Sequence, residues 1–173
     1  PRWVSQPVNL ESPTSTGLEL EVKGRVDELL AGVPLLPADL NLRGALSLYR
    51  SAVSGIPGPD NRLEQQQPWS LTLGFDHRVA GTPLGLGANL AYLPSYVVQQ
   101  TDVQRRLWGR TRNLDAYLAW HVSPAWSWRL SASNLPHSRS GGRTETVSGG
   151  TLLWDESRVT QRARWNLGLS MKL

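Results

Sequence analysis

The sequence predicts an all-β chain of antiparallel, up-and-down strands that form part of a transmembrane β-barrel. Three observations predict it: apolar and polar residues alternate with a period of two, short turns alternate with long polar connections, and the aromatic residues are mostly Trp and Tyr. The 173 residues include 8 Trp and 4 Tyr but only 1 Phe. Because Trp and Tyr concentrate where an apolar phase meets water, we expect about seven strands with one face in lipid.

The first four strands are expected at 18–25, 40–49, 69–76 and 84–92. In the first, leucine and valine alternate with charged residues, so one face is apolar and the other is ionic. The second and third alternate mainly leucine with polar residues, and the fourth alternates mainly leucine with glycine. Because successive side chains of a strand point to opposite faces, each segment presents one apolar face.

The last three strands are expected at 113–122, 126–133 and 165–173. Tryptophan, leucine and alanine fill alternate positions in the first two of them. In the third, the alternation continues through Leu167 and Leu169 to Leu173, with no polar tail. Exposed ends of soluble chains usually fray in polar residues, so this ending favours a strand that is held in a wall.

The connections between these strands alternate in length. Ser123–Ala125 and Ala80–Pro83 are tight turns, whereas 51–67, 99–112 and 134–160 are long and polar and are expected to be loops. Short turns at one end and long loops at the other are typical of a transmembrane barrel, in which the short turns are periplasmic. The alternation in length therefore supports the same architecture independently of the strand pattern.

The connection from Leu29 to Asp39 departs from this rule. It is longer and more apolar than a tight turn, and Pro34 and Pro37 argue against a helix that continues through it. Elsewhere, no stretch has the eighteen or so uninterrupted apolar residues of a membrane-spanning helix.

The tryptophans are placed as two interface belts would require. Trp120, Trp126 and Trp128 lie beside the short turn at 123–125, and Trp69 lies at the opposite rim; we expect all four at the lipid interface. Alternation alone also fits a soluble β-sandwich that serves as a binding or structural domain. This alternative predicts a monomer that melts cooperatively in plain buffer, whereas a barrel segment requires detergent.

Composition and motifs exclude several other functions. The chain has no cysteine, its net charge is only +4, and its basic residues are scattered, so we expect no thiolate chemistry and no nucleic-acid binding. His77, His121 and His137 lie on different segments without paired ligand spacing, so we expect no metal site. Glu19 and Glu21 share a strand face, which general acid–base chemistry and lumen charges would both explain; we favour lumen charges. We expect no catalytic residue, no cofactor and no enzymatic activity.

Five short segments together resemble the C-terminal barrel portion of TonB-dependent outer-membrane receptors. They are Thr-Gly-Leu-Glu-Leu-Glu at 16–21, Ile-Pro-Gly-Pro-Asp-Asn-Arg at 56–62, Gln-Pro at 67–68, Leu-Asp-Ala-Tyr at 114–117 and Leu-Ser-Ala-Ser-Asn-Leu at 130–135. Each motif is short, and the order and spacing of the motifs carry the resemblance over nearly the whole chain. The family usually ends in an aromatic residue, where this sequence has leucine.

The resemblance implies a transport protein of the bacterial outer membrane that takes up a siderophore or a similar metal chelate or nutrient. Its implied partners are membrane lipid and lipopolysaccharide, the remainder of the barrel, a plug domain, and the energy-transducing TonB system, which acts through that plug. We expect residues 1–173 to be the C-terminal portion of the barrel, with the plug and the remaining strands absent from the chain. An odd set of about seven strands does not close such a barrel, which needs about twenty-two.

Candidate ligand contacts are predicted from their location in the long loops. These residues are Asp60, Asn61, Arg62, Arg105, Arg106 and Arg110. The arginines from 105 to 112 flank Trp108, and in a barrel this rim faces anionic lipopolysaccharide or an anionic ligand, although a plain solvated loop is also consistent with the pattern.

Overall fold

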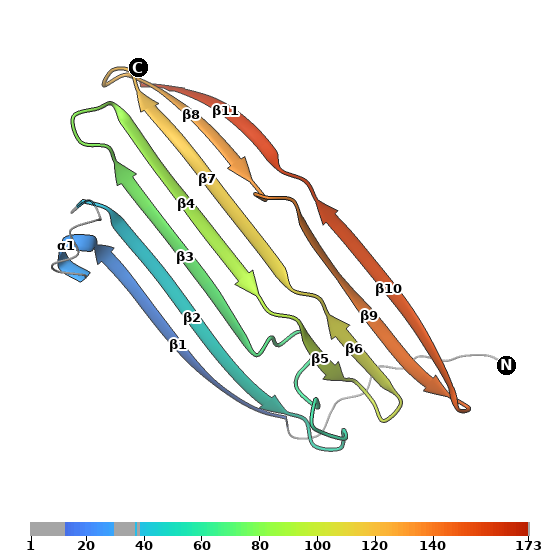
Figure 1. Ribbon diagram of the computed structural model, residues 1–173. Helices are drawn as coiled ribbons and strands as arrows, with labels where there is room; N and C mark the ends of the chain where they lie inside the picture. Colours follow the sequence, from blue (N-terminus) through green and yellow to red (C-terminus); the bar gives the residue numbers. More distant parts are fainter. Residues whose placement is uncertain (1–12, 30–36, 38, 173) are drawn as a thin grey trace.

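The structure, a computed structural model, describes residues 13–29, 37 and 39–172, and these form an open layer of antiparallel strands (Figure 1). The elements are β1 (Thr14–Arg25), α1 (Val26–Leu29), β2 (Asn41–Ala52), β3 (Trp69–Arg78), β4 (Leu84–Leu93), β5 (Tyr96–Gln99), β6 (Gln104–Trp108), β7 (Thr111–His121), β8 (Trp126–Ser133), β9 (Ser138–Ser148), β10 (Thr151–Gln161) and β11 (Arg164–Met171).

Seven strands form the main sheet, in the order β1-β2-β3-β4-β7-β8-β11. They are the seven predicted segments, and every neighbouring pair is antiparallel. The register sets apolar residues opposite one another: Leu18 faces Leu48, and Leu118 faces Leu130. The period-two pattern therefore specified both the strands and the face that each one presents.

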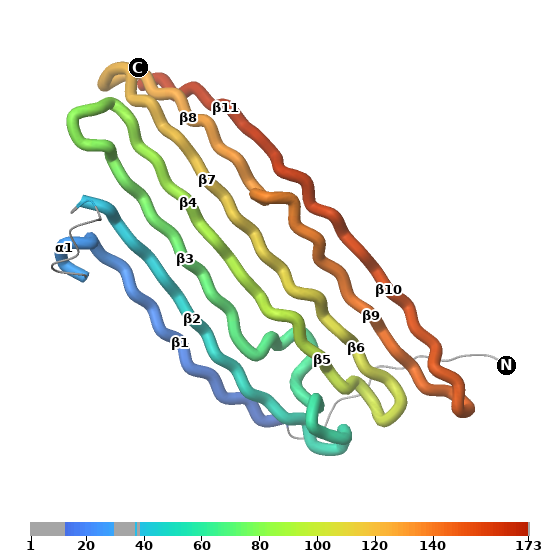
Figure 2. The backbone as a smooth tube through the Cα atoms, in the orientation of Figure 1, coloured from blue at the N-terminus to red at the C-terminus, as the bar shows by residue number. Residues whose placement is uncertain are grey.

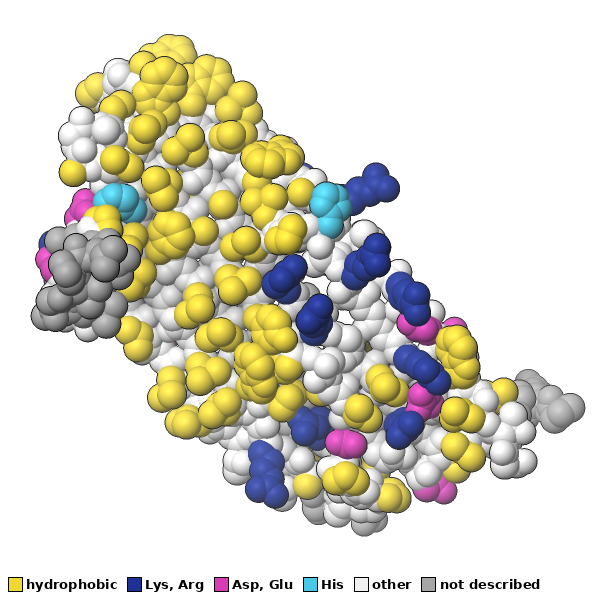
Figure 3. All heavy atoms as spheres, viewed as in Figure 1, with side chains coloured by type: hydrophobic (Ala, Val, Ile, Leu, Met, Phe, Trp, Pro, Cys, Tyr) yellow, Lys and Arg dark blue, Asp and Glu magenta, His cyan; other side chains and the backbone are white. Residues whose placement is uncertain are grey.

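The two faces of the main sheet differ in chemistry. The apolar residues share one face, here called the outer face, and the polar residues share the inner face. Leu18 is 53% exposed and Leu167 is 64% exposed, so the chain does not cover its own apolar face. Figure 3 shows apolar side chains spread over the main sheet on this face. A sandwich would bury this face against a second sheet, so the exposure favours the membrane wall.

The predicted difference between the two ends of the sheet holds for two of the connections at the C-terminal end. The β3–β4 and β7–β8 connections are tight turns at the end where the C-terminus lies, but the longer β1–β2 connection, which begins with α1, lies at this end too; the 53–68 connection lies at the opposite end (Figure 2). In the β7–β8 turn, Ser123 and Trp126 exchange backbone hydrogen bonds of 3.2 and 3.3 Å. A strand of the length of β7, 11 residues, is sufficient to cross a bilayer.

The expectation of loops at 99–112 and 134–160 is corrected by the structure. β5, β6, β9 and β10 form a second, four-stranded sheet in the order β10-β9-β6-β5. Figure 1 shows that this sheet continues the strands of the main sheet beyond their ends instead of packing across them. We call it the extension. The connection at 53–68 remains irregular up to the start of β3.

The Leu29–Asp39 connection is described only in part. α1 covers four residues and ends at Leu29, and residues 30–36 and 38 lie outside the described residues, as does Leu173. Among the residues that the structure describes, no helix is long and apolar enough to cross a membrane.

Candidate functional site

A row of polar side chains crosses the inner face of the main sheet. The Tyr117 hydroxyl donates a hydrogen bond of 2.5 Å to Asp76 Oδ1, and Arg43 forms an ion pair with the other Asp76 oxygen. The Arg129 guanidinium lies 3.6 Å from the centre of the Tyr117 ring. We call Arg43, Asp76, Tyr117 and Arg129 the inner polar row. It links β2, β3, β7 and β8 across the wall.

Glycines on neighbouring strands make room for these large side chains. A Cβ at Gly87 would lie 2.5 Å from the Tyr117 ring, and one at Gly74 would lie 2.6 Å from Arg43. Tyr49, which donates a hydrogen bond to Glu19, similarly covers Gly17. Glycine in a strand often marks a close approach of this kind. Glycine at position 87 of β4 therefore has a packing reason.

A cavity of about 400 Å³ opens on the inner face, and the inner polar row lines it together with Asn89, Asp115 and Arg164. Its walls offer charged and amide groups of both signs, which suit a hydrated lumen or a polar partner surface. Among the described residues, no group of three or more His, Cys, Asp and Glu side chains is placed to hold a metal ion.

At the end with long connections, the 53–68 segment packs against β5 and β6. The Gln99 backbone N–H donates to Asp60 O at 2.7 Å, and Asn61 Nδ2 donates to Val53 O at 3.0 Å. Glu64 lies 3.8 Å from Arg106. These contacts attach the segment that contains Asp60, Asn61 and Arg62 to the extension.

Arginine side chains and aromatic rings of β5 and β6 are in contact beside the 53–68 segment. Tyr96 stacks on Trp108 with ring centres 6.1 Å apart, and the Arg106 guanidinium lies 4.3 Å from the Trp108 ring centre. Burial raises the pKa of Tyr96, while the charges of Arg62 and Arg106 oppose that shift. Nε and Nη1 of Arg62 are buried without a hydrogen-bond partner in the described part of the chain. We call Arg62, Tyr96, Arg106 and Trp108 the loop-face cluster.

The structure divides the predicted ligand residues between two faces. Arg105 and Arg106 are consecutive in β6, so their side chains point to opposite sides. Arg105 forms an ion pair of 2.5 Å with the buried Glu145, away from the loop-face cluster. Arg110 lines a different cavity, at the junction of the two sheets. Asp60, Asn61, Arg62 and Arg106 are brought together, and their ligand role stays a prediction.

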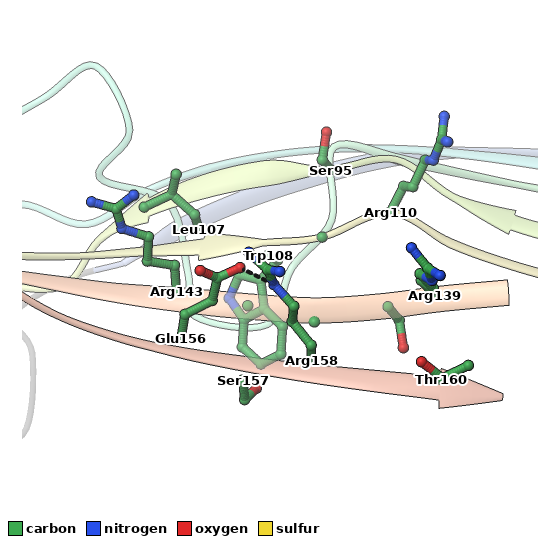
Figure 4. Close-up of a pocket in the computed structure, with 14 residues that line it drawn as sticks. Ser95, Leu107, Trp108, Arg110, Arg139, Arg143, Glu156, Ser157, Arg158 and Thr160 are labelled. Atoms are coloured by element: carbon green, nitrogen blue, oxygen red, sulfur yellow. Dashed lines mark hydrogen bonds and ion pairs between the residues drawn. The ribbon is translucent and has the colours of Figure 1, made fainter.

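The junction cavity is about 700 Å³ and is bordered by arginines of β9 and β10 and by Arg110, which precedes β7. Figure 4 shows Arg110, Arg139 and Arg143 on one side of the strands and Ser157 on the other. Arg158 donates a hydrogen bond of 2.6 Å to Glu156, and this contact lowers the pKa of Glu156. Sequence reasoning missed Arg139, Arg143 and Arg158 as site residues because it did not predict the pairing of β9 with β6 and β10 that brings them to this cavity.

The predicted interface tryptophans lie at the two ends of the outer face. Trp120 is in register with Trp128, and with Trp126 they lie next to the short turn, between 38 and 50% exposed. Trp69 stacks on Tyr92 with ring centres 5.2 Å apart, at the other end of β3. This arrangement is the one expected of aromatic belts, and their contact with lipid stays a prediction.

An antiparallel sheet with an exposed apolar outer face, a polar inner face and short turns at one end defines the chain as the wall of an outer-membrane β-barrel. Comparison with protein families agrees, because the family model "TonB dependent receptor-like, beta-barrel" matches residues 2–135. The chain therefore belongs to the TonB-dependent receptor β-barrel family. No curated protein and no solved structure gives a significant match.

Membership confirms the predicted fold class, the bacterial outer-membrane location and a role in transport, not in enzymatic catalysis. Members of this family act in the outer membrane together with the TonB system. The match ends at Leu135, so β9, β10 and β11 lie outside the matched residues.

Proposed function

We propose that this chain supplies wall and loop surface to an outer-membrane receptor that takes up a siderophore or a similar metal chelate. The observation that carries the proposal is the loop-face cluster, where two buried guanidinium nitrogens of Arg62 have no protein acceptor among the described residues. An anionic chelate would supply such acceptors, and hydrogen bonds between charged groups are stronger than neutral ones. Tyr96 and Trp108 would pack against its planar ligand groups.

In this proposal, the partners of the chain are the rest of the barrel and a plug domain. β1 and β11 are the edge strands of the main sheet, so each has one unpaired backbone edge to which a further strand of the barrel can bind. The inner polar row would face the plug, through which the TonB system would act. The tryptophans at both rims would sit at the lipid interface, with lipopolysaccharide on the side of the long connections.

Replacing both Arg62 and Arg106 with glutamine in the full-length receptor should weaken uptake. We expect the concentration for half-maximal uptake of an iron chelate to rise while the amount of receptor in the outer membrane stays the same, because binding is lost and folding is kept. The measurement is uptake of radiolabelled ferric siderophores by iron-starved cells that carry no other receptor for them.

The control is Arg78→Gln. Arg78 is the last residue of β3 and lies beside the short β3–β4 turn, at the end of the sheet opposite to the loop-face cluster. Equal uptake by the control and the double variant, across a panel of anionic chelates, would argue against the loop-face cluster as the binding surface. A receptor that remained soluble without detergent would instead support the sandwich alternative.

A further inference from the structure

A carboxylate of the 53–68 segment contacts the loop-face cluster. Glu64 Oε1 lies 3.8 Å from Arg106 Nη1 and accepts a hydrogen bond of 2.8 Å from Gln100 Nε2. Gln100 directly follows β5, in the turn that leads to β6. The side chain of Glu64 is 48% exposed and that of Arg106 is 39% exposed, so a solute can reach the contact between them.

The other polar groups of the cluster are mainly hydrogen-bond donors. Trp108 Nε1 is buried without a hydrogen-bond partner in the part of the chain that the structure describes, as are Nε and Nη1 of Arg62. Besides burial, the pKa of Tyr96 responds to both guanidinium groups of the cluster and to the Glu64 carboxylate, so these charges lie near its ring. Two guanidinium groups thus lie near one carboxylate, and positive charge is in excess.

The backbone that carries Glu64 is held in place independently of its side chain. The Gln66 N–H donates to Leu63 O at 3.2 Å, which closes a turn, and Gln65 within this turn has a φ of 61°. The Leu63 N–H donates to Ser51 Oγ at 2.9 Å. Because the turn is anchored in this way, rotation of the glutamate side chain alone moves its carboxylate away from the guanidinium, without a movement of the segment.

The contact between Glu64 and Arg106 is a loose one. Hydrogen bonds between an arginine and a carboxylate are usually about 2.7–2.9 Å long, whereas these two groups are 3.8 Å apart. Exposed ion pairs of this kind contribute little free energy. An oxyanion that binds Arg106 directly therefore replaces the Glu64 carboxylate at little cost, and it also meets the unpaired donors of the neighbouring Arg62 and Trp108.

The chemistry of the contact indicates what replaces it. The 53–68 segment places a carboxylate beside Arg106, and the planar guanidinium group matches the two oxygens of a carboxylate. We propose that Glu64 competes with the cargo: its carboxylate occupies Arg106 before the cargo binds, and a carboxylate group of a ferric chelate displaces it. The inference rests on the proposed function and adds to it the class of chelate and the residue that opposes its binding.

The test measures the binding of two radiolabelled chelates to full-length receptors in detergent, by equilibrium dialysis. The probes are ferric citrate, which carries carboxylates, and a neutral ferric trihydroxamate, which carries none. Glu64→Gln removes the charge and keeps an oxygen that accepts from Gln100. We expect this variant to bind ferric citrate about two- to five-fold more tightly, the range that an exposed ion pair contributes, and to bind the neutral chelate as the wild type does.

Two further variants locate the effect. Asp102→Asn is the matched control, because it removes the same charge from the turn between β5 and β6, and no ion pair joins Asp102 to the cluster over the described residues. We expect it to change the binding of neither chelate. In an Arg106→Gln background, Glu64→Gln should no longer tighten ferric citrate binding, since the guanidinium for which the two carboxylates compete is gone. A purely structural role of Glu64 would not depend on Arg106 in this way.

Unchanged ferric citrate binding by the Glu64→Gln variant overturns the proposal, and so does equal tightening by Asp102→Asn or of the neutral chelate. If Arg62→Gln/Arg106→Gln weakens ferric citrate binding while Glu64→Gln leaves it unchanged, the result counts against this inference alone. A wild type that does not bind ferric citrate but takes up another chelate likewise overturns the inference and leaves the proposed function standing. Binding of both chelates that is unaffected by Arg62→Gln/Arg106→Gln counts against the cluster itself, and then both proposals fail.

Discussion

Replacing Leu73 with arginine is expected to destabilise the barrel by about 2–4 kcal/mol, the cost of a basic residue on the lipid face at mid-membrane depth. Leu73 lies in the middle of β3, is 45% exposed on the outer face, and stands opposite Leu90 of β4. A guanidinium at this position has hydrocarbon around it and no acceptor nearby. The measurement is urea-induced unfolding of the full-length receptor in lipid vesicles.

Thr72→Arg is the matched control, since it places the same side chain one residue earlier and on the inner face. Thr72 is in register with Ala45 and Ala91, whose small side chains leave space for it. We expect this variant to stay close to the wild type in unfolding midpoint and in heat-modifiability. An equal loss in both variants would contradict the assignment of the outer face to lipid.

The seven wall strands could be predicted because two different solvents act on them. An apolar residue at every second position is required when one face meets lipid and the other meets water or polar protein. Leu114, Ala116 and Leu118 of β7 follow this rule, and their neighbours Asp115 and Tyr117 line the inner cavity. Leu118 is 43% exposed in the structure, which agrees with the face that the sequence predicted.

The extension could not be predicted from periodicity because neither face of it is apolar. β9 reads Ser-Arg-Ser-Gly-Gly-Arg-Thr-Glu-Thr-Val-Ser, in which small polar residues alternate mainly with charged ones, so it shows no alternation of apolar with polar residues. One local signal was present and was not used: Gly149 and Gly150 both have positive φ, 56° and 78°, and connect β9 to β10. A Gly-Gly pair between two strand-forming runs is typical of a tight hairpin turn.

The candidate sites depend on register, which single residues do not reveal. Tyr117 and Asp76 are 41 positions apart and meet only because β4 lies between their strands and has glycine at position 87. Arg105 and Arg106 were grouped because both lie in a connection interpreted as a loop, yet in a strand adjacent residues point to opposite faces. Proximity along the chain was therefore a poor guide to which side chains share a ligand.

Gly87→Ala is expected to lower the stability of the barrel by about 1–3 kcal/mol, as overpacking does in other tightly filled sites. The added Cβ would lie 2.5 Å from the Tyr117 ring, 2.7 Å from Asp76 Oδ1 and 2.7 Å from the Phe75 carbonyl oxygen. Tyr117 and Asp76 can move aside only by breaking their hydrogen bond, and the Phe75 backbone cannot move without disturbing β3. Unfolding in lipid vesicles measures the loss.

Gly85→Ala is the control, because it lies two residues earlier in β4 and on the same inner face. Its added Cβ would meet nothing closer than the His77 carbonyl oxygen at 3.8 Å, which is ordinary contact. Alanine is favoured over glycine in a strand interior by roughly 0.5–1 kcal/mol, so this variant should be neutral or slightly more stable. Removing the Tyr117 ring as well, in Gly87→Ala/Tyr117→Ala, should recover part of the loss relative to the two single changes. If Gly85→Ala and Gly87→Ala behaved alike, glycine at position 87 would not be what allows Tyr117 to reach Asp76 across β4.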